Sequence, residues 1–312
     1  MDGKRRRPGW SAVATVRTRS EYVDAFIRHY LGCGAFQVIL FFDDPDVSFL
    51  PQSPRVVGVI CDEQYWNSIG KLRPNEVENR QLANLDYAIS ITETEWLLHV
   101  DADELVISSS EIDEVLRRQP EDVFSVVATP IEAVYESSPN IADAFETRWF
   151  KRPLREDEDT SVLSILYGEL SMLTMRGLFG HVVGKAFTRA RCKIKTPSLH
   201  LPQPCDPNLR SAVAAPSVEL LHFDSLTFAD WKEKWMRRFS GEVVAIKMSE
   251  RRRRQMEMIG STHERAGDAG LLELYQKMYV LDPDRLAAAR SAGFLVERTH
   301  GMVVGPWKRM VG

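Results

Sequence analysis

The sequence predicts an α/β fold in which a mostly parallel sheet is flanked by helices, with a helical C-terminal extension. Apolar strand-like segments alternate with helix-like segments over the first 130 residues. These strand-like segments are continuously apolar, as is typical of parallel strands covered on both faces. The 312 residues, 44% hydrophobic and 27% charged, suit one large globular domain with an added helical part.

Five strand-like segments and the helices between them make up the predicted sheet. The segments are residues 11–17, 37–42, 55–60, 95–100 and 122–130. Thr18 stands three residues before Glu21, a capping-box spacing that predicts the start of the first helix. A second helix is predicted over 75–91, with Arg80 and Asn84 on a face away from its apolar stripe.

The second half of the chain has a weaker pattern. Residues 131–180 predict loops and short helices, and two more strands are expected at 181–190 and 218–223. A helical region is predicted from Thr227 to about Met258. We therefore expect one domain over residues 10–240 and a helical C-terminal extension over residues 241–312.

Charge and cysteine content narrow the class of protein. A net charge of −4 gives no basis for nucleic-acid binding. Basic runs at 4–7 and 251–254 predict solvated surface, with attraction to an anionic membrane leaflet as the alternative. Four cysteines without CxxC spacing favour a reduced, cytoplasmic protein. We expect neither a signal peptide nor a membrane span, so any membrane contact would be peripheral, at the inner face.

Acidic residues directly follow three of the predicted strands. They are Asp43 and Asp44, Asp62 and Glu63, and Asp101 and Asp103. The carboxyl ends of parallel strands meet at one edge of a sheet, where α/β folds bind ligands. Alternation along a strand predicts that the side chains of Asp101 and Asp103 point the same way. Two neighbouring carboxylates favour a hard divalent cation, so we expect Mg²⁺ or Mn²⁺ there.

Other polar residues are candidates for the same site. His222 ends the strand-like stretch VELLH and could complete a metal shell, with His181 and His200 as competitors. Lys185 could neutralise a phosphate. Arg80 and Asn84 would face a common cleft if their helix packs beside the fourth strand. The alternatives stay open: structural histidines, a surface lysine and a solvent-facing polar stripe.

Six blocks of the sequence, in this order, resemble family 2-like glycosyltransferases of the GT-A fold, in particular a bacterial branch with a short single domain. The blocks are VATVRTRSEYVDAFIRHYLGCGAFQVILFFDD, RPNEVENRQLANLDYA, WLLHVDADELV, FETRWF, GKAFTRARCKIKTPSLHLP and LLHFDSLTFADWKEKWMRRFSG. The resemblance covers most of residues 11–240. It implies a GT-A, Rossmann-like fold and transfer of a sugar, with inversion, from a UDP- or GDP-linked donor. The acceptor would be a hydroxyl of a glycan or a lipid-linked sugar in surface polysaccharide synthesis.

The resemblance also implies roles for particular residues. Asp101, Asp103 and His222 would hold Mn²⁺ or Mg²⁺. The donor-binding residues would be Arg17, Asp43, Asp44, Arg80, Asn84, Asp101 and Lys185. Inversion requires a general base, and Glu132 is the candidate that follows the fifth strand most closely. The other candidates in this region are Glu136, Asp143, Glu146 and Glu169.

Two other functions stay open. Haloacid-dehalogenase-like phosphohydrolases also carry a DxD motif after an apolar strand, but on the first strand, with Thr or Val where this chain has Leu105. A non-catalytic relative would bind the nucleotide without transferring a sugar. The chain departs from the resembled branch after the fifth strand, where TPIEAVYESS replaces a Trp and a Phe-Gly pair, so the resemblance does not identify the acceptor.

Overall fold

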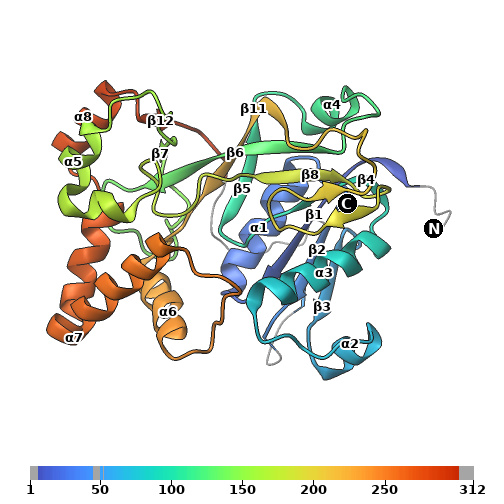
Figure 1. The fold of residues 1–312 in the computed structure, drawn as a ribbon, viewed down its shortest axis with the longest axis horizontal. Helices are drawn as coiled ribbons and strands as arrows, with labels where there is room; N and C mark the ends of the chain where they lie inside the picture. Colours follow the sequence, from blue (N-terminus) through green and yellow to red (C-terminus); the bar gives the residue numbers. More distant parts are fainter. Residues whose placement is uncertain (1–5, 45–49, 52, 302–312) are drawn as a thin grey trace. The chain divides into compact units, whose positions relative to one another are not determined.

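The computed structural model describes residues 6–44, 50–51 and 53–301. The start of the basic run 4–7 and the end of the predicted extension lie outside the described residues. The chain forms two compact units (Figure 1). The described part of the first falls within Met1–Thr129 and Val183–Leu220, and that of the second within Pro130–Val182 and Leu221–Val304. The two units do not divide at residue 240, where the sequence predicts a domain boundary. The predicted domain boundary itself stays a prediction.

Four parallel strands form one side of the sheet of the first unit. In spatial order they are β3 (Val56–Ile60), β2 (Gln37–Phe42), β1 (Arg7–Val16) and β4 (Thr94–His99). Next to β4 lies β8 (Lys185–Arg189), antiparallel to it and to the first residues of β6 (Ser125–Val134). The predicted parallel arrangement therefore holds for β1 to β4, and the later strands make the sheet mixed.

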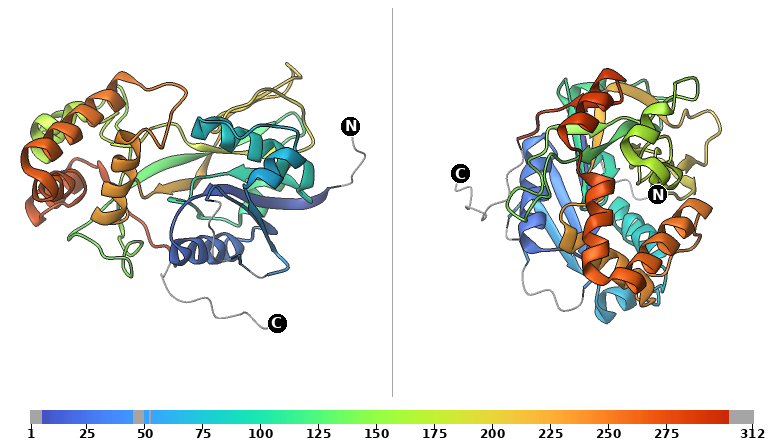
Figure 2. Two further views of the ribbon diagram at one scale, coloured as in Figure 1. Left: turned by 90° about the horizontal axis from the view of Figure 1, so that it is seen from below. Right: turned by 90° about the vertical axis from the view of Figure 1, so that its left-hand side faces the viewer.

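Helices cover both faces of these parallel strands. Figure 2 shows α1 (Ser20–Gly32) and α3 (Val77–Ile91) on opposite faces of the sheet. All six residues of β2 are buried for this reason. Ala83 and Ala88 of α3 join Ile39 and Phe41 of β2 in one apolar cluster. This cover on both faces confirms the prediction made from the continuous apolar runs, that these strands are buried on both sides.

The remaining elements of the first unit are short. They are α2 (Glu63–Ser68), β5 (Glu104–Ser108), α4 (Ile112–Arg117), the β9 (Ile194–Thr196) and β10 (Gln203–Pro204) pair, and most of β11 (Val213–His222). Strand β5 follows β4 after a tight turn and pairs with β11. The turn between β4 and β5 is the one that contains Asp101, Ala102 and Asp103.

The second unit combines a small sheet with helices. Its strands are antiparallel, in the order β12 (Leu295–Glu297), β7 (Trp149–Lys151) and the last residues of β6. Its helices are α5 (Ser161–Tyr167), the 3-10 helix η1 (Gly168–Leu173), α6 (Phe228–Phe239), α7 (Glu250–Tyr279) and α8 (Pro283–Ser291). Helix α7 is kinked at Gly267, whose φ is +57°. No helix among the described residues is both long enough and apolar enough to cross a bilayer.

Two local predictions are wrong. The N-cap of α1 is Arg19 rather than Thr18 and makes no side-chain cap hydrogen bond, so the predicted capping box does not form; the Glu21 carboxylate accepts from the Ser20 hydroxyl instead. The helical region predicted from residue 227 to about 258 is interrupted between α6 and α7. Gly241, with φ +76°, follows the end of α6 and takes the chain out of the helical conformation.

The predicted α/β class is confirmed. A central multi-stranded sheet is flanked by helices, with its parallel strands contributed by the alternating first part of the chain. This architecture is consistent with a GT-A-like, Rossmann-type fold. It places the carboxyl ends of β1, β2 and β4 side by side, because β1 lies between β2 and β4 and parallel to both.

A glycine beside β8 provides a test of the sheet packing. An added Cβ at Gly184 would overlap the backbone carbonyl of Ala128 in β6. We expect Gly184→Ala to lower the free energy of unfolding by about 3 kcal/mol, because the strands must separate to admit it. Gly32→Ala is the control: its Cβ meets nothing within 4 Å, and we expect a gain of about 0.5 kcal/mol. Urea denaturation followed by circular dichroism measures both, and equal stabilities would contradict the predicted packing.

Candidate active site at the strand ends of the first unit

A buried ion pair closes the carboxyl end of β2. Asp43 follows this strand directly, and its carboxylate accepts hydrogen bonds from Arg80 Nε and Arg73 Nη2, each at 2.9 Å. Asp43 is 6% exposed and Arg80 3% exposed. Arg80 also donates to the carbonyls of Pro74 and Asn75, in the loop before α3. Arg80 is therefore not part of a solvent-facing stripe, and it fastens α3 and its preceding loop to the end of β2.

One helical turn along α3, Asn84 connects three elements. Its side-chain amide donates to Thr15 Oγ1 on β1 at 2.9 Å, and its carbonyl accepts from the Tyr65 hydroxyl on α2 at 2.8 Å. Asn84 is 1% exposed. Asp62 caps α2 by accepting from the backbone N–H of Tyr65. Helix capping thus explains Asp62, the first residue of the acidic pair that the sequence places after β3.

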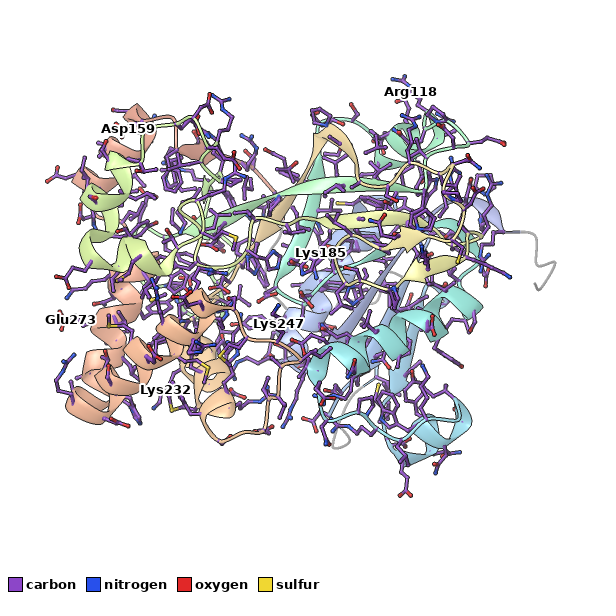
Figure 3. All side chains as sticks on the ribbon, viewed as in Figure 1. Arg118, Asp159, Lys185, Lys232, Lys247 and Glu273 are labelled. Carbon is purple, nitrogen blue, oxygen red and sulfur yellow. The ribbon has the colours of Figure 1, made fainter. Side chains whose placement is uncertain are left out.

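Asp101 lies at the carboxyl end of β4 and is held by two donors. Its Oδ1 accepts from Gln81 Nε2 of α3 at 2.7 Å, and its Oδ2 accepts from Lys185 Nζ at 2.8 Å. Lys185, labelled in Figure 3, is the first residue of β8 and is 1% exposed. Its ammonium also lies 3.4 Å from the fully buried Glu104, which in turn accepts the backbone N–H of Asp101 at 2.8 Å. The two carboxylates therefore share one buried cation.

The electrostatics keep Asp101 and Lys185 ionised. Burial alone would raise the pKa of Asp101, but the Lys185 ammonium outweighs it and holds that pKa well below its usual range. Burial alone would lower the pKa of Lys185, but the carboxylates of Asp101 and Glu104 raise it above its ordinary value. Burial and the Lys185 charge lower the pKa of the neighbouring His99 to about 3, so His99 is neutral at physiological pH.

The local structure of the DxD stretch differs from the prediction. Strand β4 ends at His99, and residues 101–103 lie in the turn that leads into β5. Strand alternation therefore does not set the directions of Asp101 and Asp103. The expected strand at these residues was wrong, and a common direction of the two side chains stays a prediction. The turn arises because the Glu104 carboxylate binds the Asp101 N–H three residues back, while Glu104 N–H donates to the Asp101 carbonyl at 3.1 Å.

The residues of this turn fit a hard divalent cation. The Asp101 side chain is 35% exposed, and each of its oxygens has a lone pair beyond the one used by Gln81 or Lys185. Asp103 lies half-buried on the same turn. Among the described residues, no three His, Cys, Asp or Glu side chains converge as a preformed metal site. Mg²⁺ is commonly held by one or two carboxylates together with substrate phosphates and water, so such a set is sufficient.

Two further predicted donor-binding residues lie at the same strand ends. Arg17 follows β1 and Asp44 follows Asp43, and Arg17 Nε lies 3.9 Å from Asp44 Oδ2. Both side chains are partly exposed. His200, a competitor for the metal, also belongs to the first unit, where its Nδ1 lies 3.2 Å from the carbonyl of Gly184. The first unit thus brings together every predicted donor-binding residue, and the role of each stays a prediction.

The second unit contains the other predicted residues. Glu132 is fully buried: it accepts the N–H groups of Phe179 and Gly180 at 2.9 and 2.6 Å and pairs with Lys151 at 2.7 Å. His222 Nδ1 lies 3.9 Å from Glu132 Oε2. The His222 and His181 rings stack with their centroids 5.5 Å apart. Whether Glu132 acts as a base and His222 as a metal ligand remains predicted.

Sequence reasoning missed three participants in these networks. Gln81 and Arg73 contact the two strand-end aspartates, and Lys151 pairs with Glu132. Gln81 follows Arg80 directly, so the polar face of α3 is wider than the predicted pair. Lys151 directly follows Trp149 and Phe150, and this position in an apolar strand is the one local feature that could have pointed to it.

Comparisons with known proteins add little to this geometry. No known family model matches the chain, and no curated protein matches its sequence. Among solved structures, S. aureus TarS 1-349 is similar with a TM-score of 0.35 and 11% identity, over 91% of this chain and 80% of that one. The mannosyltransferase Ktr4p from S. cerevisiae is similar with a TM-score of 0.24 and 13% identity, over 42% of this chain and 41% of that one. Likenesses at TM-scores this low carry no argument about function.

Removing the shared cation should destabilise the first unit. We expect Lys185→Met to lower the free energy of unfolding by about 3 kcal/mol at neutral pH, since Glu104 keeps a buried charge without its partner. The lowered pKa of Asp101 means that the pair contributes above the unfolded pKa of about 4 and is lost as the pH falls through the folded value. The difference in unfolding free energy between Lys185→Met and the wild type should therefore become smaller at acid pH. Lys71→Met, which breaks an exposed pair with Asp86, is the control in urea denaturation at several pH values, and an equal loss there would contradict the prediction.

The buried pair of the second unit allows a parallel test. Lys151→Met should cost about 3–5 kcal/mol because it leaves Glu132 charged and fully buried. Adding Glu132→Gln should recover part of this loss by removing the charge while keeping an acceptor for a backbone N–H. Lys277→Met, at an exposed pair with Glu273, should change stability by less than about 0.5 kcal/mol. Thermal denaturation of the wild type, the two single variants and the double variant measures these changes. A double variant less stable than Lys151→Met would show that the loss of charge pairing does not cause the destabilisation.

Proposed function

We propose that this protein transfers a sugar from a nucleotide-diphosphate donor to an acceptor hydroxyl, with Mn²⁺ or Mg²⁺ bound at the Asp101–Asp103 turn. One observation carries the proposal: the carboxyl ends of β1, β2 and β4 present a connected polar network anchored on α3, with Asp101 partly open to solvent. Nucleotides bind at this edge of α/β sheets. The ordered sequence blocks that resemble glycosyltransferases support the same reading.

The residues of the network divide into two groups by position. Asp101 would face the diphosphate, with the buried Lys185 offsetting the charge of the Asp101 carboxylate and Gln81 fixing its orientation. When held by Asp101 and Asp103, a divalent cation would supply positive charge that stabilises the negative charge developing on the diphosphate as it leaves. Asp43, held by Arg80 and Arg73, would position the nucleoside at the end of β2. The chain thus supplies preorganised polar groups, which reduce the reorganisation needed during reaction.

For the general base we favour residues other than Glu132. Three donors occupy the Glu132 carboxylate, and water does not reach it. A base must contact the acceptor hydroxyl, so a fully buried and paired carboxylate is better suited to holding the chain around residues 179–180. Glu136, Glu146 and Glu169 are exposed and remain the candidates from this part of the sequence. The acceptor, a glycan or a lipid-linked sugar of bacterial surface polysaccharide synthesis at the cytoplasmic face, is proposed from the resemblance alone.

A phosphohydrolase is less favoured by the position of the motif. Its first aspartate would follow the first strand of the chain, whereas Asp101 follows β4, and Leu105 stands where such enzymes have Thr or Val. Magnesium-dependent turnover of an aryl phosphate that disappears in Asp101→Asn would favour the phosphohydrolase over the transferase.

Titration calorimetry of UDP and GDP, with and without Mn²⁺, tests the proposed donor site. We expect one nucleotide to bind in a metal-dependent way, and Asp103→Ala to abolish this dependence while the fold stays intact, with a loss of stability of no more than about 1 kcal/mol. Asp86→Ala, on the exposed face of α3, is the matched control and should bind as the wild type does. Absence of metal-dependent binding for both nucleotides would refute the donor site. Binding without slow hydrolysis of any donor sugar would indicate a non-catalytic relative.

A further inference from the structure

The segment between α6 and α7 exposes an unusual set of apolar side chains. We call residues 240–248 the apolar loop, because the exposed fractions are 42% for Val244, 56% for Ile246 and 37% for Met248. Twelve large apolar side chains are exposed among the described residues, and three of them fall within these nine positions. Scattered apolar residues on a surface need no explanation, but a concentration of them marks an interaction site.

Basic residues surround the apolar loop. Residues 237–254 contain seven of them and two glutamates, a net charge of +5 in a chain whose overall charge is −4. The seven are Arg237, Arg238, Lys247, Arg251, Arg252, Arg253 and Arg254. The local charge is therefore opposite in sign to that of the whole chain.

The arginines of the run 251–254 have different roles. Arg251 donates to the carbonyl of Phe179, and Arg252 donates to Gln255 at 2.8 Å with its guanidinium over the Trp235 ring. These two fix the start of α7, so the expectation of a wholly solvated run was wrong for them. Arg253 is exposed, and Arg254 pairs with Glu250 at the surface. Lys247, labelled in Figure 3, lies exposed within the apolar loop itself.

The two ends of the apolar loop are held in place. The N–H of Val243 donates to the carbonyl of Arg237 at 3.2 Å, next to Gly241. At the other end, Ser249 caps α7 by accepting the N–H of Arg252 at 3.2 Å. Trp231 of α6 is buried and packs edge-on against Tyr275 of α7. The two helices thus pack through other residues, while Val244, Ile246 and Met248 stay exposed.

We propose that the apolar loop docks this protein on an anionic lipid bilayer. Val244, Ile246 and Met248 would enter the interfacial layer, while Lys247 and Arg253 contact the lipid headgroups. Apolar side chains combined with cations are the two features that peripheral membrane segments use, and each cation near an anionic surface adds attraction. The three side chains are aliphatic or thioether groups without an aromatic ring for base stacking, which favours lipid over a nucleic acid. This inference does not depend on the proposed sugar transfer.

Co-sedimentation with vesicles tests the proposal on the full chain without any nucleotide. We expect binding to vesicles of phosphatidylcholine mixed with phosphatidylglycerol, and weak or no binding to phosphatidylcholine alone. The combined variant Val244→Ser, Ile246→Ser and Met248→Ser should reduce the partition coefficient by roughly tenfold or more. The matched control replaces three apolar residues of the same unit with comparable exposure, Ile165, Met172 and Leu272, by serine, and should bind as the wild type does.

A second pair of variants tests the charges. Lys247→Glu with Arg253→Glu should also lower binding about tenfold or more, and the effect should weaken as salt is added. Lys193→Glu with Lys195→Glu makes the same charge change at exposed positions of the first unit and is the control. Equal binding by the apolar triple variant and its control, or no binding of the wild type to anionic vesicles, would overturn the proposal. So would a triple variant that loses nucleotide affinity but keeps vesicle binding, because the loop would then serve a bound ligand.

Discussion

The structure of the candidate site depends on one buried lysine. Lys185 is inaccessible to water, and a buried ammonium is tolerated only when paired and hydrogen-bonded. Its partners, Asp101 and Glu104, lie at either end of the turn between β4 and β5. The antiparallel pairing of β8 with β4 brings the lysine to that turn, since Leu98 pairs with Phe187 two residues after it. The cation therefore couples the register of two strands to the position of the DxD turn.

Helix α3 extends this coupling to the other strand ends. Arg80, Gln81 and Asn84 contact residues at the ends of β2, β4 and β1, respectively. Residues three and four positions apart lie on one face of a helix, and Gln81 is close enough to that face to reach Asp101. One helix thus fixes polar groups from three strands before any ligand binds, which is the preorganisation that binding of a polar, multiply charged molecule requires.

Features set by neighbouring residues in the sequence could be predicted, whereas most features set by contacts between distant segments could not. The parallel strands and α3 could be predicted because apolar runs and helical periodicity are local signals. The DxD turn could not be told from a strand end, since its shape depends on a hydrogen bond from Asp101 N–H to Glu104. The break after α6 carried local signals that the prediction overlooked: Gly241 ends the helix, and Val244, Ile246 and Met248 lie two residues apart, which is not helical spacing. Pairings such as Glu132 with Lys151 leave no local pattern in either segment.

A buried lysine–glutamate pair also occurs in the second unit. Glu132 and Lys151 form a fully buried pair, and the glutamate also accepts the N–H groups of Phe179 and Gly180, as Glu104 accepts that of Asp101. A buried ion pair is a poor source of stability, because the loss of hydration offsets the attraction. Its effect here is positional: a Cβ at Gly180 would meet both the His222 ring and the Glu132 carboxylate, so the backbone at 180 can approach them only as glycine. In each unit a buried lysine and glutamate thus fix the backbone of the segment that carries a predicted site residue, Asp101 in one and His181 beside His222 in the other.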